Sequence, residues 1–407
     1  MLSAEDRAIL ELEGATVAGH TCKVITLAGR PLAAEDLRAH VAERLREDSL
    51  LRRRLGSQDG VPAWVPHRAF DLADHIQDRR ADGHDLDEVV GAIFSGHLDR
   101  TLPLWRIDVT EMPGTGTIVV WKIHHALADG TTAMRLARTL LWDEIDAGGA
   151  TGSGHHDRGA DDERRRDHLA GFIARELTTS LHHSPFDGAI GTERQVAFAS
   201  IPFVPLHDAA HSLAGATVND AVIAAVRGGL RSWLHAHGIN ANALRIKVPV
   251  SLHREAEQAA NHDSFFSLPV DLRIQDHVTA LRAIHRATTA RKVGHDAQRW
   301  EALAASLSSH SKRLGAALER IQRSPRTFAV CVSNVPGPRN DLFVAQRPVR
   351  SVYSVAEIGQ RHGLRITALS AAGALNVGFC ADPAVVPDVH VLAAATHDTA
   401  QQLIGAG

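Results

Sequence analysis

Two adjacent histidines, His124 and His125, open the most informative stretch of the 407-residue sequence. With Asp129 and Gly130 they give the pattern HHxxxDG, written HHALADG in this chain. The unperturbed pKa of histidine is about 6.5, so much of it is neutral at pH 7 and can accept a proton. Moving an acyl group from a thioester to a hydroxyl needs such a base and donors for the oxyanion, but no metal. The pattern therefore predicts acyl transfer by general base catalysis, with no cofactor beyond the thioester substrate.

The elements around the motif predict how it is held. Residues 117–123 are β-branched and aromatic and predict a buried strand, and the apolar spacing of residues 133–141 predicts one face of a helix. The motif then occupies the strand-to-helix loop. Because adjacent strand residues face opposite sides, only one histidine should reach a substrate. We predict that His125 is the base and that His124 is packed in the core.

Asp129 and Gly130 complete the motif and have structural as well as functional interpretations. Asp129 either orients the imidazole or forms an ion pair, and it is also a favoured N-cap for the following helix. Gly130 removes a side chain where backbone and substrate must approach closely. Zinc binding by His124 and His125 is disfavoured, since their side chains diverge and no third ligand has a customary spacing.

A second copy of HHxxxDG runs from His182 to Gly188. It follows a polar stretch, contains Pro185 and leads into no apolar helix. A motif counts only in its structural context, so we interpret this copy as a loop rather than a second active site.

The remaining pattern predicts an α/β fold of two layered domains. Further helices are predicted over residues 37–51, 217–234 and 390–403, and strands over 244–250, 264–270, 327–333, 364–369 and 374–380, the last two as a hairpin. Residues 146–167 are too polar to build a core and predict a linker. The predicted division is 1–145, a linker or crossover over 146–185, and 186–407.

The composition of the chain limits the kinds of partner and the cellular compartment that are expected. The formal net charge of -3 would not attract nucleic acid, so nucleic acid is not expected as a partner. The three cysteines lack CxxC spacing, which fits a reducing cytoplasm. The chain has neither a secretory signal pattern nor an 18-residue apolar run, so no transmembrane segment is expected. Peripheral contact with lipid stays open.

Several separated motifs make the chain resemble the bacterial wax ester synthase/diacylglycerol acyltransferase family, within the chloramphenicol acetyltransferase-like and condensation-domain group. They follow the family's order nearly end to end and are LSAED, FDLADHI (70–76), PLWRIDV (103–109), HHALADG (124–130), IGTERQVAFASIP (190–202), TVNDAVIAAV (217–226), PVSLH (249–253), SNVPGP (333–338) and GLRITALSAAGALNVGFCAD (363–382).

The resemblance implies two chloramphenicol acetyltransferase-like domains, each a mixed sheet with flanking helices, and an active-site channel between them. It implies that His125 is the base, that Asp129 is a structural carboxylate and that Asn219 organises the site or stabilises the oxyanion. Asp220, Ser333 and Asn334 are implied substrate-binding residues. Thr217 to Asp220 is also an [ST]-x-x-[DE] capping box, and SNVPGP is also typical of a turn after a strand.

Three functions are carried forward. The first is an acyl-CoA:alcohol O-acyltransferase that acts on a fatty alcohol or diacylglycerol. The second is a tailoring acyltransferase that esterifies or amidates a polar natural product, with an acyl carrier protein as an alternative donor. It is motivated by a shorter interdomain segment than is typical of the family and by an aromatic content of only 4%. The third is a non-catalytic homologue that binds an acyl carrier.

Overall fold

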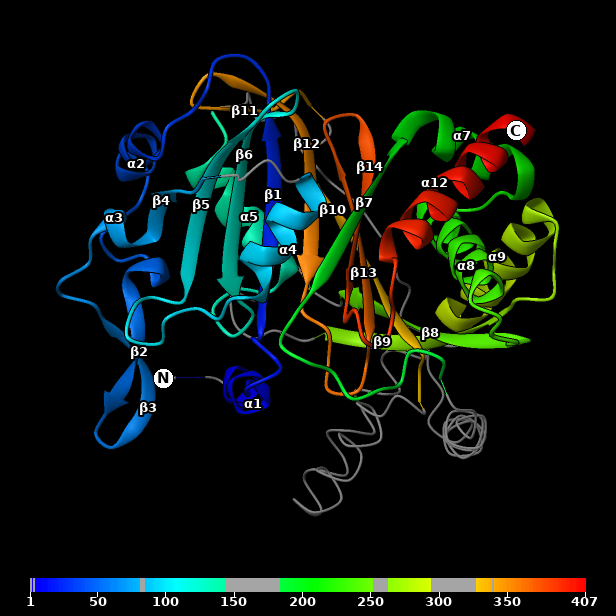
Figure 1. The fold of residues 1–407 in the computed structure, drawn as a ribbon, viewed down its shortest axis with the longest axis horizontal. Helices are drawn as coiled ribbons and strands as arrows, with labels where there is room; N and C mark the ends of the chain where they lie inside the picture. The colour runs from blue at the N-terminus through cyan, green and yellow to red at the C-terminus, as the bar shows by residue number, and fades with distance from the viewer. Residues whose placement is uncertain are drawn as a thin grey trace, which may run out of the picture.

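Two six-stranded sheets stand side by side in the computed structural model, with helices packed around them (Figure 1). The structure describes residues 2, 4–80, 85–143, 184–251, 263–293, 327–338 and 340–407. The predicted α/β class is confirmed. The described helices are α1 (Ala4–Leu12), α2 (Ala34–Ala42), α3 (Leu72–His75), α4 (Leu86–Ser95), α5 (Gly130–Leu140), α7 (Phe203–Ala214), α8 (Val218–Ala236), α9 (His277–Val293) and α12 (Val389–Ala406), with the 3-10 turn η1 (Leu50–Arg52).

The first sheet has the order β11-β12-β1-β6-β5-β4 and is antiparallel except for the β4–β5 pair. Its strand β6 is buried along almost its whole length, which explains why the sequence there is continuously apolar rather than alternating. The strands are β1 (His20–Leu27), β4 (Ile76–Asp78), β5 (Trp105–Met112), β6 (Gly116–His124), β11 (Phe343–Val344) and β12 (Arg347–Ala356).

The second sheet has the order β7-β14-β13-β10-β8-β9. Strand β10 runs parallel to β13 and β8, and the other pairs are antiparallel. The strands are β7 (Gln195–Pro202), β8 (Ala243–Ser251), β9 (Asp263–Asp271), β10 (Val330–Pro336), β13 (Leu364–Ala371) and β14 (Ala374–Ala381). A separate hairpin joins β2 (Arg53–Gln58) to β3 (Val61–Pro66).

Strand β12 crosses from the C-terminal part of the chain into the first sheet. It follows β10 in sequence but pairs along its length with β1, for example Val352 with Ile25. The two sheets are thus tied by chain connectivity as well as by packing. The boundaries 1–145, 146–185 and 186–407 stay a prediction.

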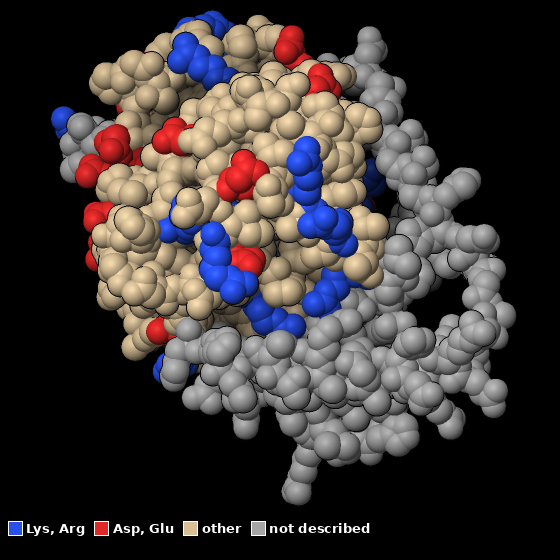
Figure 2. All heavy atoms as spheres, turned by 90° about the vertical axis from the view of Figure 1, so that its right-hand side faces the viewer, with Lys and Arg blue, Asp and Glu red and all other residues tan. Residues whose placement is uncertain are grey.

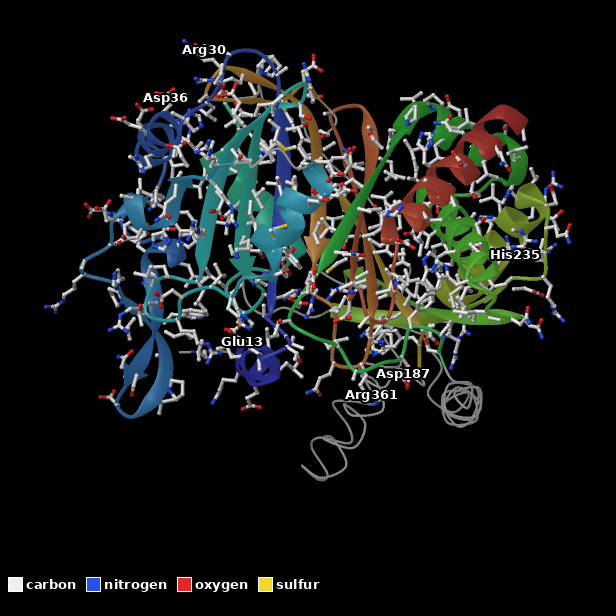
Figure 3. The ribbon with its side chains drawn as sticks, viewed as in Figure 1. Glu13, Arg30, Asp36, Asp187, His235 and Arg361 are labelled. Atoms are coloured by element: carbon white, nitrogen blue, oxygen red, sulfur yellow. The ribbon has the colours of Figure 1, made fainter. Side chains whose placement is uncertain are left out.

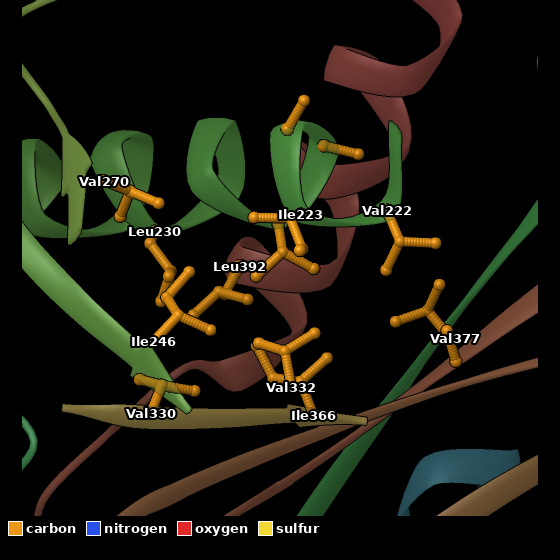
Figure 4. Packing of buried hydrophobic residues seen from close by; sticks show 14 of the residues in the cluster. Val222, Ile223, Leu230, Ile246, Val270, Val330, Val332, Ile366, Val377 and Leu392 are labelled. Atoms are coloured by element: carbon orange, nitrogen blue, oxygen red, sulfur yellow. The ribbon is translucent and has the colours of Figure 1, made fainter. Parts of the chain in front are cut away.

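A large apolar core lies between the second sheet and the helices α7, α8, α9 and α12 (Figure 4). The inner face of α8 supplies Val222, Ile223 and Leu230, which lie over Ile246 and Val332 of the sheet. This helix is buried because its apolar residues recur at three- and four-residue spacing, as the sequence predicts for 217–234.

Two smaller cores lie on opposite faces of the first sheet. One face packs on α5, and this cluster also includes Leu369 and Ala371 of β13. The other face packs on α4, and this cluster includes Val196 of β7 and Cys380 of β14. Both clusters therefore contain residues of the two sheets, so the sheets share apolar contacts.

Most elements predicted from periodicity are present, and two of them need correction. The helix predicted over residues 37–51 ends at Ala42, because a turn follows in which the amide of Leu45 bonds to Val41 and Ser49 caps the separate turn η1. The strand predicted from residue 327 begins at Val330. Among the described helices, none has the length and apolar content that a bilayer crossing requires.

Candidate active site

The HHxxxDG motif lies at the predicted strand-to-helix junction. Strand β6 ends at His124, and α5 begins at Gly130. His125 is the first residue beyond the strand, and its amide donates to the carbonyl of Gly19 at 2.9 Å. The predicted context of the motif is confirmed, and the loop is anchored to the segment that leads into β1.

His124 is buried, with 1% of its surface exposed. The amide of Ala126 donates to its Nδ1 at 3.1 Å, so the ring proton belongs on Nε2. That nitrogen lies 3.3 Å from Oε2 of Glu13, which also accepts from Arg100 Nε at 3.0 Å. Nδ1 thus accepts a backbone hydrogen bond and Nε2 faces a carboxylate, as expected for the packed member of the pair.

Glu13 follows α1 at one end of the first sheet (Figure 3). Burial alone would raise the pKa of its carboxyl, but hydrogen bonds with His124 and Arg100 hold that pKa below the ordinary value. Gly19 leaves the space that the ring occupies, because a Cβ at that position would lie 2.7 Å from His124 Nε2. Glu13, held by Arg100, therefore fixes the ring of His124.

His125 differs from its neighbour, since it is only partly buried. Its Nδ1 is buried and has no hydrogen-bond partner among the described residues. Burial lowers the pKa of His125 to about 4, and the positive charge of Arg365 acts in the same direction, while Asp129 opposes them. The imidazole is consequently neutral at pH 7, which is the form that accepts a proton.

Asp129 is buried and caps α5, because its carboxylate accepts from the amide of Thr132 at 2.6 Å. The N-cap interpretation is confirmed. Its charge also acts on Lys23, a fully buried lysine of β1 whose Nζ donates to Ser354 Oγ at 2.7 Å. Burial lowers the pKa of Lys23 to about 8, although Cys22 and Asp129 raise it. Asp129 thus serves as a helix cap and as a fixed negative charge near His125.

Gly130 brings the motif against the second sheet. A Cβ at this position would lie 3.5 Å from Cγ2 of Val335 on β10, which is an ordinary contact distance. Neither this contact nor the backbone of Gly130 demands glycine. The contact does show that the end of the HHxxxDG loop meets the SNVPGP segment.

Ser333 and Asn334 lie within β10, so the turn interpretation of SNVPGP is wrong for Ser333 to Pro336. These residues continue the strand because they pair in parallel register with β13, and the amide of Gly337 then donates to Ser370 Oγ. Ser333 shares a face with Val335, and its hydroxyl lies 3.3 Å from that of Thr367. Asn334 points to the opposite, helix-covered face.

Asn219 and Asp220 lie in the first turn of α8. The capping box is confirmed, since Asp220 accepts from the amide and hydroxyl of Thr217, both at 2.9 Å. Asp220 also bonds to His285 Nδ1 at 2.9 Å and to Thr288 Oγ1 at 2.6 Å. Asn219 is partly exposed beside it. Within the described residues, no hydrogen bond joins this turn to the HHxxxDG loop.

The second HHxxxDG copy is described only from Ser184 onward, and His182 and His183 lie outside the described residues. Phe186 is fully buried in the core of the second sheet. Asp187 pairs with Arg361 at 2.8 Å (Figure 3). The described part of this copy is a packed segment that leads toward β7.

A buried ionic cluster next to the site was not predicted from the sequence. Arg194 donates to Glu357 Oε1 at 2.7 Å, to the carbonyl of Thr16, and lies 3.6 Å from Asp382 Oδ2. Burial raises the pKa of the Glu357 carboxyl, and Arg194 opposes that shift. The signal available in the sequence was an arginine within the motif at 190–202, with its partners more than 160 residues away.

Two cavities among the described residues lie apart from the motif. The larger, about 380 Å³, is lined by residues of α4, β7 and α12, including Asp87 and His397. The smaller, about 260 Å³, lies near Phe70. Neither is lined by His125 or Asp129, so the channel that the resemblance implies stays a prediction.

Comparison with known proteins agrees with this architecture. The wax ester synthase/diacylglycerol acyltransferase catalytic domain matches residues 2–174, and the C-terminal domain of the same family matches 260–403. A probable diacylglycerol O-acyltransferase of Mycobacterium tuberculosis is 27% identical over 403 residues, covering 89% of this chain and 86% of the relative. A second, putative enzyme of that name from the same species is 29% identical over 373 residues, covering 81% and 73%.

Solved structures show the same fold. The wax ester synthase/diacylglycerol acyltransferase of Marinobacter aquaeolei superposes with a TM-score of 0.74 at 21% identity, covering 99% of this chain and 98% of that one. A starter condensation domain of rhizomide synthetase gives a TM-score of 0.59 at 14% identity, covering 100% and 94%. The family domains together span well over half of the sequence and include the HHxxxDG loop. The chain therefore belongs to the wax ester synthase/diacylglycerol acyltransferase family and is an acyltransferase.

Proposed function

We propose that the protein transfers an acyl group from acyl-CoA to the hydroxyl of a fatty alcohol or diacylglycerol, with His125 as general base. The observation that carries the proposal is the state of His125. It is neutral at pH 7, partly accessible and anchored at the end of β6, whereas His124 is buried against Glu13. The names of the Mycobacterium relatives favour diacylglycerol as the acceptor.

The chemistry assigned to His125 is a proton relay. As the alcohol oxygen attacks the thioester carbonyl carbon, the hydroxyl proton passes to the imidazole and the C–O bond forms. The tetrahedral intermediate then collapses, the C–S bond breaks, and the imidazolium returns the proton to the departing thiolate. No net proton is consumed, so one histidine can complete the cycle.

The other predicted site residues receive supporting roles in this proposal. Asp129 fixes the start of α5 and supplies a negative charge that stabilises the imidazolium, while His124 holds the loop and Gly130 leaves room for substrate beside it. Ser333, on the strand face that meets the loop, contacts substrate. Asn219 organises the site or stabilises the oxyanion, Asp220 holds that turn of α8, and Asn334 supports β10.

A second candidate is acyl transfer from a carrier protein to a polar natural product. The similarity to a condensation domain favours it, and so does a group of Lys and Arg side chains, with a few Asp and Glu among them, on the outer face of the C-terminal half (Figure 2). Helix α9 carries three arginines, Arg282, Arg286 and Arg291, and its sequence contains no acidic residue. We place either activity in the cytoplasm, with peripheral lipid contact for a lipid acceptor.

Product analysis separates these functions. The protein is incubated with acyl-CoA of several chain lengths and a panel of fatty alcohols, diacylglycerol, and polar alcohols and amines, and products are identified by mass spectrometry. We expect wax ester or triacylglycerol with equimolar release of CoA. Product from polar acceptors or carrier-bound acyl groups alone would replace the first function by the second. No product from any pair would support a non-catalytic homologue.

A further inference from the structure

Arg365 lies at the start of β13, on the face of the second sheet that meets the first sheet. In the sheet register it stands beside Cys331 of β10 and Cys380 of β14, so the three side chains share a face. Cys380 packs in the same cluster as Cys22 and Val24 of β1. Arg365 therefore projects toward the first sheet rather than toward the helices that cover the second.

Hydrogen bonds connect Arg365 with the segment that anchors His125. Arg365 Nη1 donates to the carbonyl of Glu357 at 3.1 Å, and the amide of Glu357 donates to the carbonyl of His20 at 3.1 Å. The adjacent residue, Gly19, accepts from the amide of His125. Arg365 is thus linked to the dipeptide Gly19-His20 through Glu357, and His125 bonds to the same dipeptide directly.

The contact with Glu357 involves only one nitrogen of the Arg365 guanidinium, Nη1. Its Nε is buried and has no hydrogen-bond partner among the described residues. The backbone carbonyl of Glu357 accepts from Arg365, whereas the side-chain carboxylate of Glu357 accepts from Arg194. The positive charge of Arg365 therefore acts on its surroundings without a direct carboxylate partner among the described hydrogen bonds.

Three charged or titratable groups act on His125 across this junction. Arg365 and the adjacent His124 disfavour its protonated form, and Asp129 favours that form. Asp129 also acts on the buried cation Lys23. Arg365 is the only group of the three that comes from the second sheet.

We propose that Arg365 is a positioning residue that keeps His125 in its neutral, proton-accepting form, an inference that rests on the proposed role of His125 as base. A nearby fixed cation opposes the imidazolium that forms when the alcohol proton is taken. It thereby favours prompt return of that proton to the thiolate leaving group. The second sheet would then contribute to the chemistry of a base that the first sheet carries.

Titration of His125 by NMR tests this inference directly. The full-length protein is labelled with ¹⁵N-histidine, and the His125 signal is assigned by its loss in His125→Gln. We expect the unmodified protein to keep His125 neutral down to about pH 5, and Arg365→Gln to raise its pKa by roughly one unit. Arg365→Lys, which retains the charge, should restore the lower pKa, and the acid limb of kcat/KM should move with it.

Arg347→Gln is the matched control. Like Arg365, Arg347 is an arginine of the C-terminal part that donates to backbone carbonyls, but it lies at the far end of β12 and pairs with Asp36. Its replacement should leave His125 unchanged. If Arg365→Gln does not fold, Arg365→Met preserves the apolar stem and gives the same test.

An unchanged pKa of His125 in a folded Arg365→Gln or Arg365→Met variant would overturn the inference. Failure of the proposed function looks different, because His125→Ala would then retain full turnover whatever the titration shows. The two results come from separate measurements and can be told apart.

Discussion

His124 and His125 occupy consecutive positions and have opposite surroundings. One ring is enclosed by Glu13 and the amide of Ala126, and the other keeps accessible surface and a neutral imidazole. The difference arises because His124 is the last residue of β6 and His125 the first residue beyond it. Adjacent side chains of an extended chain point in opposite directions. The buried ring of His124 therefore fixes the loop from which His125 projects.

Glu13→Ala should slow turnover without preventing folding. The substitution leaves Nε2 of His124 and the guanidinium of Arg100 without their shared carboxylate, and a misplaced loop costs rate because proton transfer depends on geometry. We expect kcat to fall by roughly tenfold to a hundredfold with little change in KM. Steady-state kinetics with circular dichroism checks this.

Glu11→Ala serves as the matched control, since Glu11 is exposed on α1, two residues before Glu13, and its replacement should leave kcat unchanged. A loss of kcat common to both variants would count against the assigned role of Glu13.

The motif and its place between a strand and a helix were predictable from sequence because both depend on local patterns. HHxxxDG spans seven residues, and the apolar patterns on both sides determine its strand and helix. Glu13, Arg365 and Glu357 were not predictable, because each acts on the site from a distant part of the chain. Single charged residues in apolar motifs carry no periodicity that would mark their partners.

Elements with strong periodicity were predicted within a few residues, as α8 and the β13–β14 hairpin illustrate. The helix over 37–51 was too long because Leu45 and Leu50 continue its spacing, although the chain turns after Ala42 and leaves Leu50 exposed. Ser333 to Pro336 contain turn-forming residue types, yet pairing with β13 keeps them extended. Tertiary pairing overrides local preference in that case.

The capping box of α8 shows how one element acquires two functions. Its sequence predicts the bond between Thr217 and Asp220, and the structure adds His285 and Thr288 of α9. Burial opposes ionisation, but these hydrogen bonds hold the pKa of Asp220 below its ordinary value. Asp220 thereby joins α8 to α9 and fixes the turn that presents Asn219.

At the scale of the molecule, β12 and the Arg194 cluster tie the two sheets together. Pairing of β12 with β1 places residues 347–356 in a sheet whose other long strands come from the first third of the chain. No local pattern could predict that exchange, because it depends on contacts separated by more than 300 residues. The two sheets should consequently unfold in one transition.

Arg194→Ala should lower the free energy of unfolding by about 3–5 kcal/mol, because it leaves the buried carboxylate of Glu357 without its cation. Chemical denaturation measures this value. Arg46→Ala is the control, since Arg46 and Asp48 form a pair that is exposed on both sides and its loss should leave the free energy of unfolding almost unchanged. Similar small losses in both variants would show that the Arg194 cluster does not hold the sheets together.

The central claim is that His125 takes the alcohol proton, and the rate of ester formation by His125→Ala tests it most directly. The comparison is His183→Ala, the same substitution in the second HHxxxDG copy, with both proteins checked for folding and assayed at saturating acyl-CoA and acceptor. We predict that His125→Ala loses about 10²–10⁴ in kcat or more, while His183→Ala stays within about twofold of the unmodified protein. Equal and mild losses in the two variants would contradict the account.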